Sequence, residues 1–246
     1  MARQRNERPV LWSLRPSGEH AALRRAAQAA GWCLRVLPVL RTREREVAPA
    51  LAAALACDWR IATSPVAVRV AARAGAWPRR GVDLAVGAGT AAALEVAGAR
   101  DIRQPARMDS EGLLALPELA GAVAGPIGLL TAPGGRGLIA STLRARGAVL
   151  CEAAVYERLP LHGAARRFAA FAAAPGAPLL LSSGEALEHL LRRLGVAAEA
   201  RLRTRPVVVP GERLAASLRA LGVDDLRLAA SPRAAAMIAA LGPPRP

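Results

Sequence analysis

Short runs of β-branched residues and leucine alternate with alanine-, leucine- and arginine-rich stretches of helical length along almost the whole 246-residue chain. This alternation is typical of βα units, which build parallel sheets with helices on both faces. The expected strands are Val10–Leu14, Leu34–Leu37, Trp59–Thr63, Val82–Val86, Asp101–Arg103, Ile127–Thr131, Val149–Val155, Leu179–Ser182, Val207–Val209 and Leu226–Ala229. Helices are expected to begin near Ser17, Val47, Pro65, Gly89, Ser110, Gly135, Ala164, Gly184, Glu212 and Ser231.

Ten strands are too many for one five-stranded sheet and do not match an eight-fold barrel. Two doubly wound domains of five strands each, the flavodoxin-like size, fit better. The pattern turns extended and then charged at 38–41 and again at 155–159, and we interpret these segments as paired crossover strands. The chain is then expected to form a discontinuous α/β domain from 1–37 and 160–246 and an inserted α/β domain from 42–154.

The composition indicates in which cellular compartment the chain works and whether it holds a structural metal. With 53% hydrophobic residues the chain can bury a core, and its longest apolar stretch, Ala48 to Cys57, is far below the ~20 residues that span a bilayer. We therefore expect no membrane span and no signal peptide. The cysteines are odd in number and show no CxxC spacing, and the histidines are far apart, which favours a reducing, cytoplasmic compartment and no structural metal site.

All 34 basic residues are arginine, and the formal net charge is +15. The planar guanidinium grips carboxylates and phosphates in a bidentate way, so the charge suits a polyanionic small molecule or a nucleic acid, although a solvated basic surface is the plainer interpretation. Arginine is spread throughout the chain and aromatic residues make up only 3% of it, which gives little support to stacking on single-stranded nucleic acid. We expect no nucleic-acid partner.

The segment from Val86 to Ala92 reads GxGxxA between an expected strand and helix, which is close to a dinucleotide-binding fingerprint. The acid that would hold a ribose should follow the next strand, but Asp101–Arg103 ends in arginine and is followed by Gln104. The motif is weak support for a nicotinamide enzyme. It predicts instead a tight turn at a helix N-terminus, with backbone N–H groups around Gly89 and Thr90 that can bind an anion.

Other expected strand ends repeat this design. Each could simply cap a helix, since serine and threonine are the commonest N-caps. In open parallel sheets, however, ligands bind outside the carboxyl ends of the strands, where all these loops lie. The loops carry Thr63-Ser64-Pro65, Gly134-Gly135-Arg136-Gly137, Ser182-Ser183-Gly184 and Ser231-Pro232.

Established catalytic motifs are missing: there is no GxSxG, no GxxxxGK[ST] and no HExxH, and no cysteine has an obvious base beside it. The single tyrosine, Tyr156, lies in the second crossover segment, where its phenol could reach a cleft between the domains or could be a half-buried linker side chain.

The succession of motifs along nearly the whole chain resembles the uroporphyrinogen-III synthase family of tetrapyrrole biosynthesis. No single motif is specific, but their order is. They are Leu14-Arg15-Pro16, Gly31-Trp32, Asp58-Trp59, Thr63-Ser64-Pro65, Val86-Gly87-Ala88-Gly89-Thr90-Ala91, Asp109-Ser110-Glu111-Gly112-Leu113-Leu114, Gly135-Arg136, Val155-Tyr156-Glu157-Arg158, Ser182-Ser183, Val209-Pro210 and Ala230-Ser231-Pro232.

The resemblance implies two α/β domains joined by a two-stranded β-ladder. It also implies an activity: closure of the linear tetrapyrrole hydroxymethylbilane to uroporphyrinogen III, with inversion of the last ring through a spirocyclic intermediate and without metal or organic cofactor. The substrate carries four acetates and four propionates, which helix N-termini and arginine suit. A monomer in transient contact with hydroxymethylbilane synthase is expected.

The resemblance also implies roles for single residues. Tyr156 matches the family's interdomain tyrosine and is the candidate general acid for loss of the substrate hydroxyl. The expected carboxylate-binding residues are Arg15, Ser64, Gly89, Thr90, Arg136, Ser182, Ser183 and Ser231.

Three positions depart from the family pattern: Leu14 replaces a usual threonine, Pro133 enters the loop before Gly134, and Pro210-Gly211-Glu212 stands where a hydroxyl is common. These departures leave open a relative that binds tetrapyrroles without isomerising them. The residues alone also leave open a nucleotide-dependent oxidoreductase that uses Gly87 and Gly89.

Overall fold

The computed structural model describes residues 8–17, 20–121, 125–134, 137–161 and 165–244. The chain divides into two compact units, residues 1–42 with 159–246 (unit 1) and residues 43–158 (unit 2). Each unit is built on its own five-stranded sheet, and a two-stranded sheet pairs β3 (Leu40–Glu44) with β9 (Tyr156–Pro160). The expected α/β class, with two parallel sheets and a two-stranded ladder, is confirmed.

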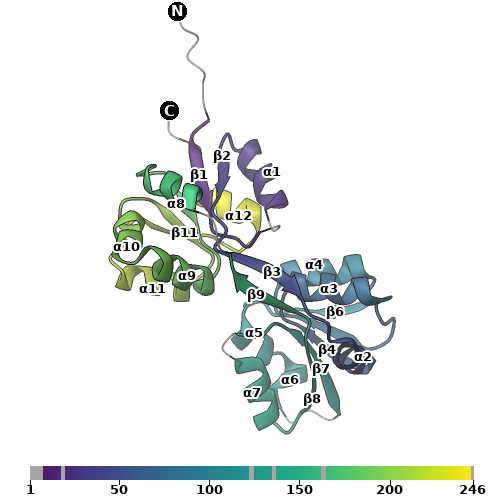
Figure 1. The fold of residues 1–246 in the computed structure, drawn as a ribbon. Helices are drawn as coiled ribbons and strands as arrows, with labels where there is room; N and C mark the ends of the chain where they lie inside the picture. Colours follow the sequence, from purple (N-terminus) through teal and green to yellow (C-terminus); the bar gives the residue numbers. More distant parts are fainter. Residues whose placement is uncertain (1–7, 18–19, 122–124, 135–136, 162–164, 245–246) are drawn as a thin grey trace, which may run out of the picture. The chain divides into compact units, whose positions relative to one another are not determined.

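The unit 1 sheet has the strand order β12-β11-β10-β1-β2, and all its pairs are parallel. Figure 1 shows β1 and β2 side by side in this sheet. Numbered by appearance in this unit, the order is 2-1-3-4-5 read from the β2 edge, which is the flavodoxin-like order. The strands are β1 (Val10–Ser13), β2 (Cys33–Val36), β10 (Leu179–Leu180), β11 (Val207–Val209) and β12 (Leu226–Leu228). The helices are α1 (Ala21–Ala29), α8 (Ala165–Ala172), α9 (Gly184–Leu194), α10 (Val196–Arg203), α11 (Glu212–Ala220) and α12 (Ala234–Ala239).

Alternate residues of β1 face different layers of the unit 1 core. Leu11 packs with Leu23 of α1 and Met237 of α12, whereas Trp12 packs among residues of α8, α9, α10 and α11. Trp12 meets Phe171 edge to face, with the ring centroids 5.5 Å apart. Because successive strand side chains point to opposite faces, apolar residues at both positions bury a strand between two helical layers.

The unit 2 sheet has the order β6-β5-β4-β7-β8 and is also parallel. Numbered by appearance within this unit, the order is 3-2-1-4-5, the other common doubly wound arrangement. The strands are β4 (Trp59–Ala62), β5 (Val82–Ala85), β6 (Asp101–Arg103), β7 (Pro126–Thr131) and β8 (Val149–Ala154). The helices are α2 (Ala48–Ala56), α3 (Pro65–Ala74), α4 (Ala88–Ala97), α5 (Ser110–Leu114), α6 (Pro117–Ala120) and α7 (Leu138–Ala145).

Helix α2 lies directly on strands β7 and β8 of the unit 2 sheet. A Cβ atom added at Gly128 of β7 would lie 2.0 Å from the backbone oxygen of Ala54 in α2. Glycine is therefore required here by the close approach of helix and strand rather than by an unusual backbone angle.

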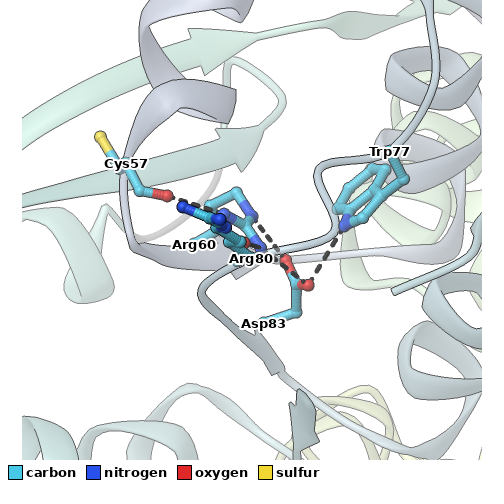
Figure 2. Close-up of polar contacts among 5 residues, drawn as sticks. All are labelled: Cys57, Arg60, Trp77, Arg80 and Asp83. Atoms are coloured by element: carbon cyan, nitrogen blue, oxygen red, sulfur yellow. Dashed lines mark hydrogen bonds and ion pairs between the residues drawn. The ribbon is translucent and has the colours of Figure 1, made fainter. Parts of the chain in front are cut away.

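The second residues of two neighbouring strands in this sheet, β4 and β5, form a buried ion pair (Figure 2). Arg60 of β4 and Asp83 of β5 have side chains that are 2% and 1% exposed, and Arg60 Nε donates to Asp83 Oδ1 at 2.8 Å. The guanidinium also donates to the carbonyl oxygens of Cys57 and Arg80, and the Trp77 indole N–H donates to Asp83 Oδ2 at 3.1 Å. Both charges are thus hydrogen-bonded as well as paired, which is what burying them requires.

The helices differ from the sequence-based expectation in five places. Helices α6 and α10 were not expected. Three helices begin later than expected: α1 at Ala21 instead of Ser17, α7 at Leu138 instead of Gly135, and α12 at Ala234 instead of Ser231. Gly195, with φ 53° and ψ −139°, ends α9 and precedes α10, because this backbone conformation breaks a helix and suits glycine. Among the described residues, no helix combines the length and apolar character needed to cross a membrane.

Candidate functional site

The candidate site in unit 2 lies where its strand order reverses. β4 and β7 are neighbours in the sheet, α3 follows β4, and α7 comes after β7. Helices α3 and α7 pack into different core layers of the unit, so the two chain segments part at the carboxyl ends of these strands. A doubly wound sheet leaves a crevice at such a point. A cavity of about 310 Å³ is found there, lined by Thr63, Ser64, Ser110, Thr131, Tyr156 and Arg158 among others.

Tyr156 brings its hydroxyl to this cavity while its ring stays in the core. The residue is 2% exposed and packs with the apolar side chains of the α2, α3 and α4 layer. Its hydroxyl oxygen lies 3.0 Å from Ser64 Oγ and 3.2 Å from Arg158 Nη2. The Arg158 guanidinium carbon is 5.4 Å from the centroid of the Tyr156 ring, within cation–π range.

Ser64 reaches the tyrosine because it is the N-cap of α3. Its backbone is extended, and its Oγ accepts a hydrogen bond from Ala67 N at 3.1 Å. Pro65 occupies the first helical position, where its missing N–H costs nothing. The Thr-Ser-Pro sequence thus fixes the serine hydroxyl at the rim of the cavity.

Two threonines that end neighbouring strands complete this rim. Thr63 Oγ1 lies 3.1 Å from the Leu130 carbonyl oxygen, to which it donates, and 3.3 Å from Thr131 Oγ1. Thr131, Ser110, Glu152 and Arg158 were not among the expected site residues. The strand period of two could have revealed Arg158, because it places Tyr156 and Arg158 on one side of a strand.

Gly89 and Thr90 lie in the first turn of α4, after its N-cap residue Gly87. Gly89 is exposed and Thr90 is 2% exposed. Neither is among the described residues that line the cavity. Asp109 lies about 20 residues beyond this turn, the distance at which a dinucleotide site carries its ribose-binding acid. It gives such a site no support, because it caps α5 through Gly112 N and accepts from Arg107 Nε at 2.6 Å.

Unit 1 gathers its expected site residues at its own switch point. β1 and β10 are neighbours, with Ser13 opposite Leu180, so the loops carrying Arg15 and Ser182 start side by side. Arg15 Nη2 donates to the Pro232 carbonyl oxygen at 2.6 Å, which joins the loop after β1 to the loop that contains Ser231.

The serines of this rim make local contacts. Ser183 caps α9 by accepting from Ala186 N at 3.3 Å, and Ser182 is half-buried beside it. Ser231 Oγ accepts weakly from Arg233 N at 3.4 Å and does not cap α12, whose N-cap is Arg233. Arg136 lies outside the described residues.

His20 is buried close to the same rim, at the N-cap of α1. Burial is the main reason that its pKa is lowered to about 4, and the positive charges of Arg15 and Arg24 lower it further. The imidazole is therefore neutral at pH 7. Within the described parts of the chain, no group of three or more His, Cys, Asp or Glu side chains could hold a metal ion.

The chain shares sequence with known proteins of one family. The family model described as "Uroporphyrinogen-III synthase HemD" matches residues 21–239. Over 157 residues the chain is 36% identical to the uroporphyrinogen-III synthase of Salmonella typhimurium, and over 156 residues it is 35% identical to that of Escherichia coli. Each match covers 62% of this chain and 63% of the relative.

Two solved structures share the fold. A uroporphyrinogen III synthase mutant from Thermus thermophilus superposes with a TM-score of 0.66 at 22% identity, covering 95% of this chain and 97% of that one. The uroporphyrinogen-III synthetase of Helicobacter pylori gives a TM-score of 0.60 at 14% identity, with the same coverage. At these identities the two structures show a shared fold only. The family model, by contrast, matches the sequence over residues 21–239. The chain belongs to the uroporphyrinogen-III synthase family.

Proposed function

We propose that the protein closes hydroxymethylbilane to uroporphyrinogen III, with inversion of the last ring. Membership of the family supports the reaction. The observation that carries the proposal on this chain is the Tyr156 hydroxyl, placed with Ser64 and Arg158 on a cavity at the unit 2 switch point. The volume of about 310 Å³ is at the lower end for ligand sites, so this cavity would hold only part of a tetrapyrrole.

The chemical task is orientation more than bond activation. Loss of the substrate hydroxyl gives an electrophilic azafulvene, which closes to the wrong isomer unless the last ring is held so that its substituted α-carbon attacks first. We assign Tyr156 the role of general acid that protonates the leaving hydroxyl. Tyr156 is the only tyrosine in the chain, so no other phenol could take this role.

Substrate carboxylates would be held at the rims of the two sheets. Backbone N–H groups at the starts of α3 and α9 point outward at these rims and carry the positive end of the helix dipole. In unit 1, Arg15 adds a guanidinium that donates to the Pro232 carbonyl oxygen in the loop with Ser231. In unit 2, Ser64 adds a hydroxyl, and the α4 turn with Gly89 and Thr90 and the loop with Arg136 are further candidates.

The partners and compartment follow from the same proposal. We assign a monomer that acts in the cytoplasm, where its three free cysteines fit a reducing environment. Its substrate is unstable in water and closes spontaneously, so transient contact with hydroxymethylbilane synthase would serve its transfer.

Ligand-induced stabilisation tests the substrate class. Uroporphyrin, with eight carboxylates, is expected to raise the melting temperature by several degrees at saturating concentration, because ligand at 100 times Kd stabilises by about 2.7 kcal/mol. NADPH is expected to cause no shift, and DNA binding that falls steeply with salt is not expected. Differential scanning fluorimetry measures the shifts.

A pair of matched variants localises the binding. Arg15→Gln is expected to reduce the uroporphyrin shift, because it removes a guanidinium from the unit 1 rim. Arg25→Gln removes an equal charge from an exposed position on α1 and should leave the shift unchanged. A shift with NADPH and none with uroporphyrin would favour the oxidoreductase alternative.

A further inference from the structure

The Tyr156 oxygen sits between two groups that can donate hydrogen bonds to it. In the described part of the chain, Ser64 Oγ lies 3.0 Å and Arg158 Nη2 lies 3.2 Å from this oxygen. Arg158 can only donate, because a guanidinium has no acceptor. Ser64 already accepts the Ala67 N–H at 3.1 Å, which leaves its own proton to donate toward the tyrosine.

A phenol oxygen accepts up to two hydrogen bonds and donates one. When Ser64 and Arg158 occupy its two acceptor positions, the phenolic proton must point elsewhere. Ser64, Tyr156 and Arg158 all line the same cavity, so the remaining direction opens onto the space where a ligand would bind.

From this geometry we propose that Arg158 is a positioning residue for the reaction: together with Ser64, it holds Tyr156 as a proton donor toward the cavity and stabilises the phenolate left after proton transfer. The catalytic part of this inference rests on the proposed function. Arg158 acts through Tyr156 and is not itself required to touch the reacting atoms.

The positive charge of Arg158 is placed where it can stabilise a negative charge on the Tyr156 oxygen. Tyr156 is 2% exposed, and a charge on its oxygen is poorly screened by water at such a site. Two acids of unit 2 pair with arginines other than Arg158: Glu157 on β9 with Arg43, and Glu152, which also lines the cavity, with Arg144. Arg45 of the same unit donates to the Ala154 carbonyl oxygen at 3.2 Å. Arg158 is thus the cation seen to contact the phenol oxygen among the described residues.

The proton that Tyr156 donates in this step is returned to it later in the reaction. The bond between the substrate's terminal carbon and its hydroxyl oxygen breaks with both electrons on oxygen, and the phenolic proton leaves with that oxygen as water. A phenolate then faces a cationic azafulvenium. Ring closure releases one proton from a ring carbon, which returns to the phenolate, so no other reagent is consumed.

Titration of the tyrosine tests the contact without any reference to activity. Tyr156 is the only tyrosine, so tyrosinate absorbance near 295 nm reports this residue alone. Tyrosinate is expected to appear at higher pH in Arg158→Gln than in the wild-type protein, with Arg158→Lys between the two. Arg103→Gln is the matched control, because the Arg103 guanidinium carbon lies 5.8 Å from the centroid of the Trp59 ring and its ion pairs are with Asp101 and Glu118. Circular dichroism at each pH identifies the range in which each protein stays folded.

Identical titration midpoints for Arg158→Gln and the wild-type protein, both folded, would overturn the proposal. Kinetics give the second test. Arg158→Gln is expected to lower kcat for type III formation by at least about tenfold, as loss of a positioned donor does, with KM changed by less than about threefold. In a Tyr156→Phe background, Arg158→Gln should cause no further loss.

An equal loss from Arg158→Gln in both backgrounds would mean that Arg158 acts on the substrate directly, and would contradict its role through Tyr156. Failure of the proposed function has a different signature. In that case the wild-type protein forms no type III product, while the titration still decides whether Arg158 controls the phenol.

Discussion

Replacing Tyr156 with phenylalanine is expected to lower kcat for type III formation roughly hundredfold, the usual contribution of a general acid. The benzene ring is retained, so the packing of this 2%-exposed side chain in the unit 2 core changes little. The hydroxyl that bonds to Ser64 and Arg158 is lost. Because the departing hydroxyl then leaves without its proton donor, the loss should fall on kcat, with binding of uroporphyrin retained. Initial rates on enzymatically generated hydroxymethylbilane measure both effects.

Ser141→Ala is the matched control for this experiment. It also removes one hydroxyl from unit 2, at an exposed site on α7 where the hydroxyl donates to the Leu138 carbonyl oxygen. Its kcat should equal that of the wild-type protein. A Tyr156→Phe variant with an unchanged rate would remove Tyr156 from the mechanism.

The largest expected effect on stability comes from Asp83→Asn. The substitution leaves the Arg60 guanidinium, with a side chain 2% exposed, without its counter-charge and weakens the acceptor of the Trp77 indole. Breaking one partner of a buried ion pair costs about 3–5 kcal/mol in unfolding free energy. Gly81 adds to the constraint, because a Cβ there would lie 2.7 Å from Arg60 Nη1, so the guanidinium has little room to move. Urea denaturation measures the change.

Asp101→Asn on the neighbouring strand β6 is the comparison. Asp101 also pairs with an arginine, Arg103, but the two side chains are 50% and 43% exposed and the closest N to O distance is 3.4 Å. An exposed pair of this kind contributes at most about 1 kcal/mol. Equal losses in the two variants would show that burial of the Arg60–Asp83 pair has no energetic consequence.

The alternation of apolar runs and helical stretches was enough to predict the architecture. Parallel strands buried on both faces, such as Val207–Val209, read as continuous apolar runs, and this signal depends only on neighbouring residues. The order of strands within each sheet could not be predicted, because it depends on which strands pair. The alternation of strands and helices in the sequence is compatible with either order in either unit. The structure has 2-1-3-4-5 in unit 1 and 3-2-1-4-5 in unit 2.

Helix ends were predicted well where a cap is local and poorly where tertiary contacts decide. Ser64-Pro65 and Ser183-Gly184 begin helices as expected, because a serine N-cap and its hydrogen bond lie within a few residues. Ser231 looked equivalent, yet α12 begins three residues later, at Ala234. There the Pro232 carbonyl oxygen accepts from Arg15, 217 positions away in the chain, and such a contact leaves no local signal.

The sequence could indicate which loops lie at the candidate site, but not which of their side chains contact one another. Expected strand ends carried Thr63, Ser64 and Thr131, because ligands of open parallel sheets bind at these ends. The contact of Tyr156 with Ser64 joins residues 92 positions apart, and it required the fold. No role was predicted for Arg158 itself, although its position two residues after Tyr156 on one strand places its guanidinium 3.2 Å from the Tyr156 hydroxyl oxygen.

The measurement that tests the central claim most directly is the isomer composition of the product. The protein is supplied with hydroxymethylbilane generated in place by its synthase, the products are oxidised to porphyrins, and the type I and type III isomers are separated by chromatography. We predict a dominant type III product that forms in proportion to the amount of protein. Formation of type I alone, at the rate seen without the protein, would contradict the account.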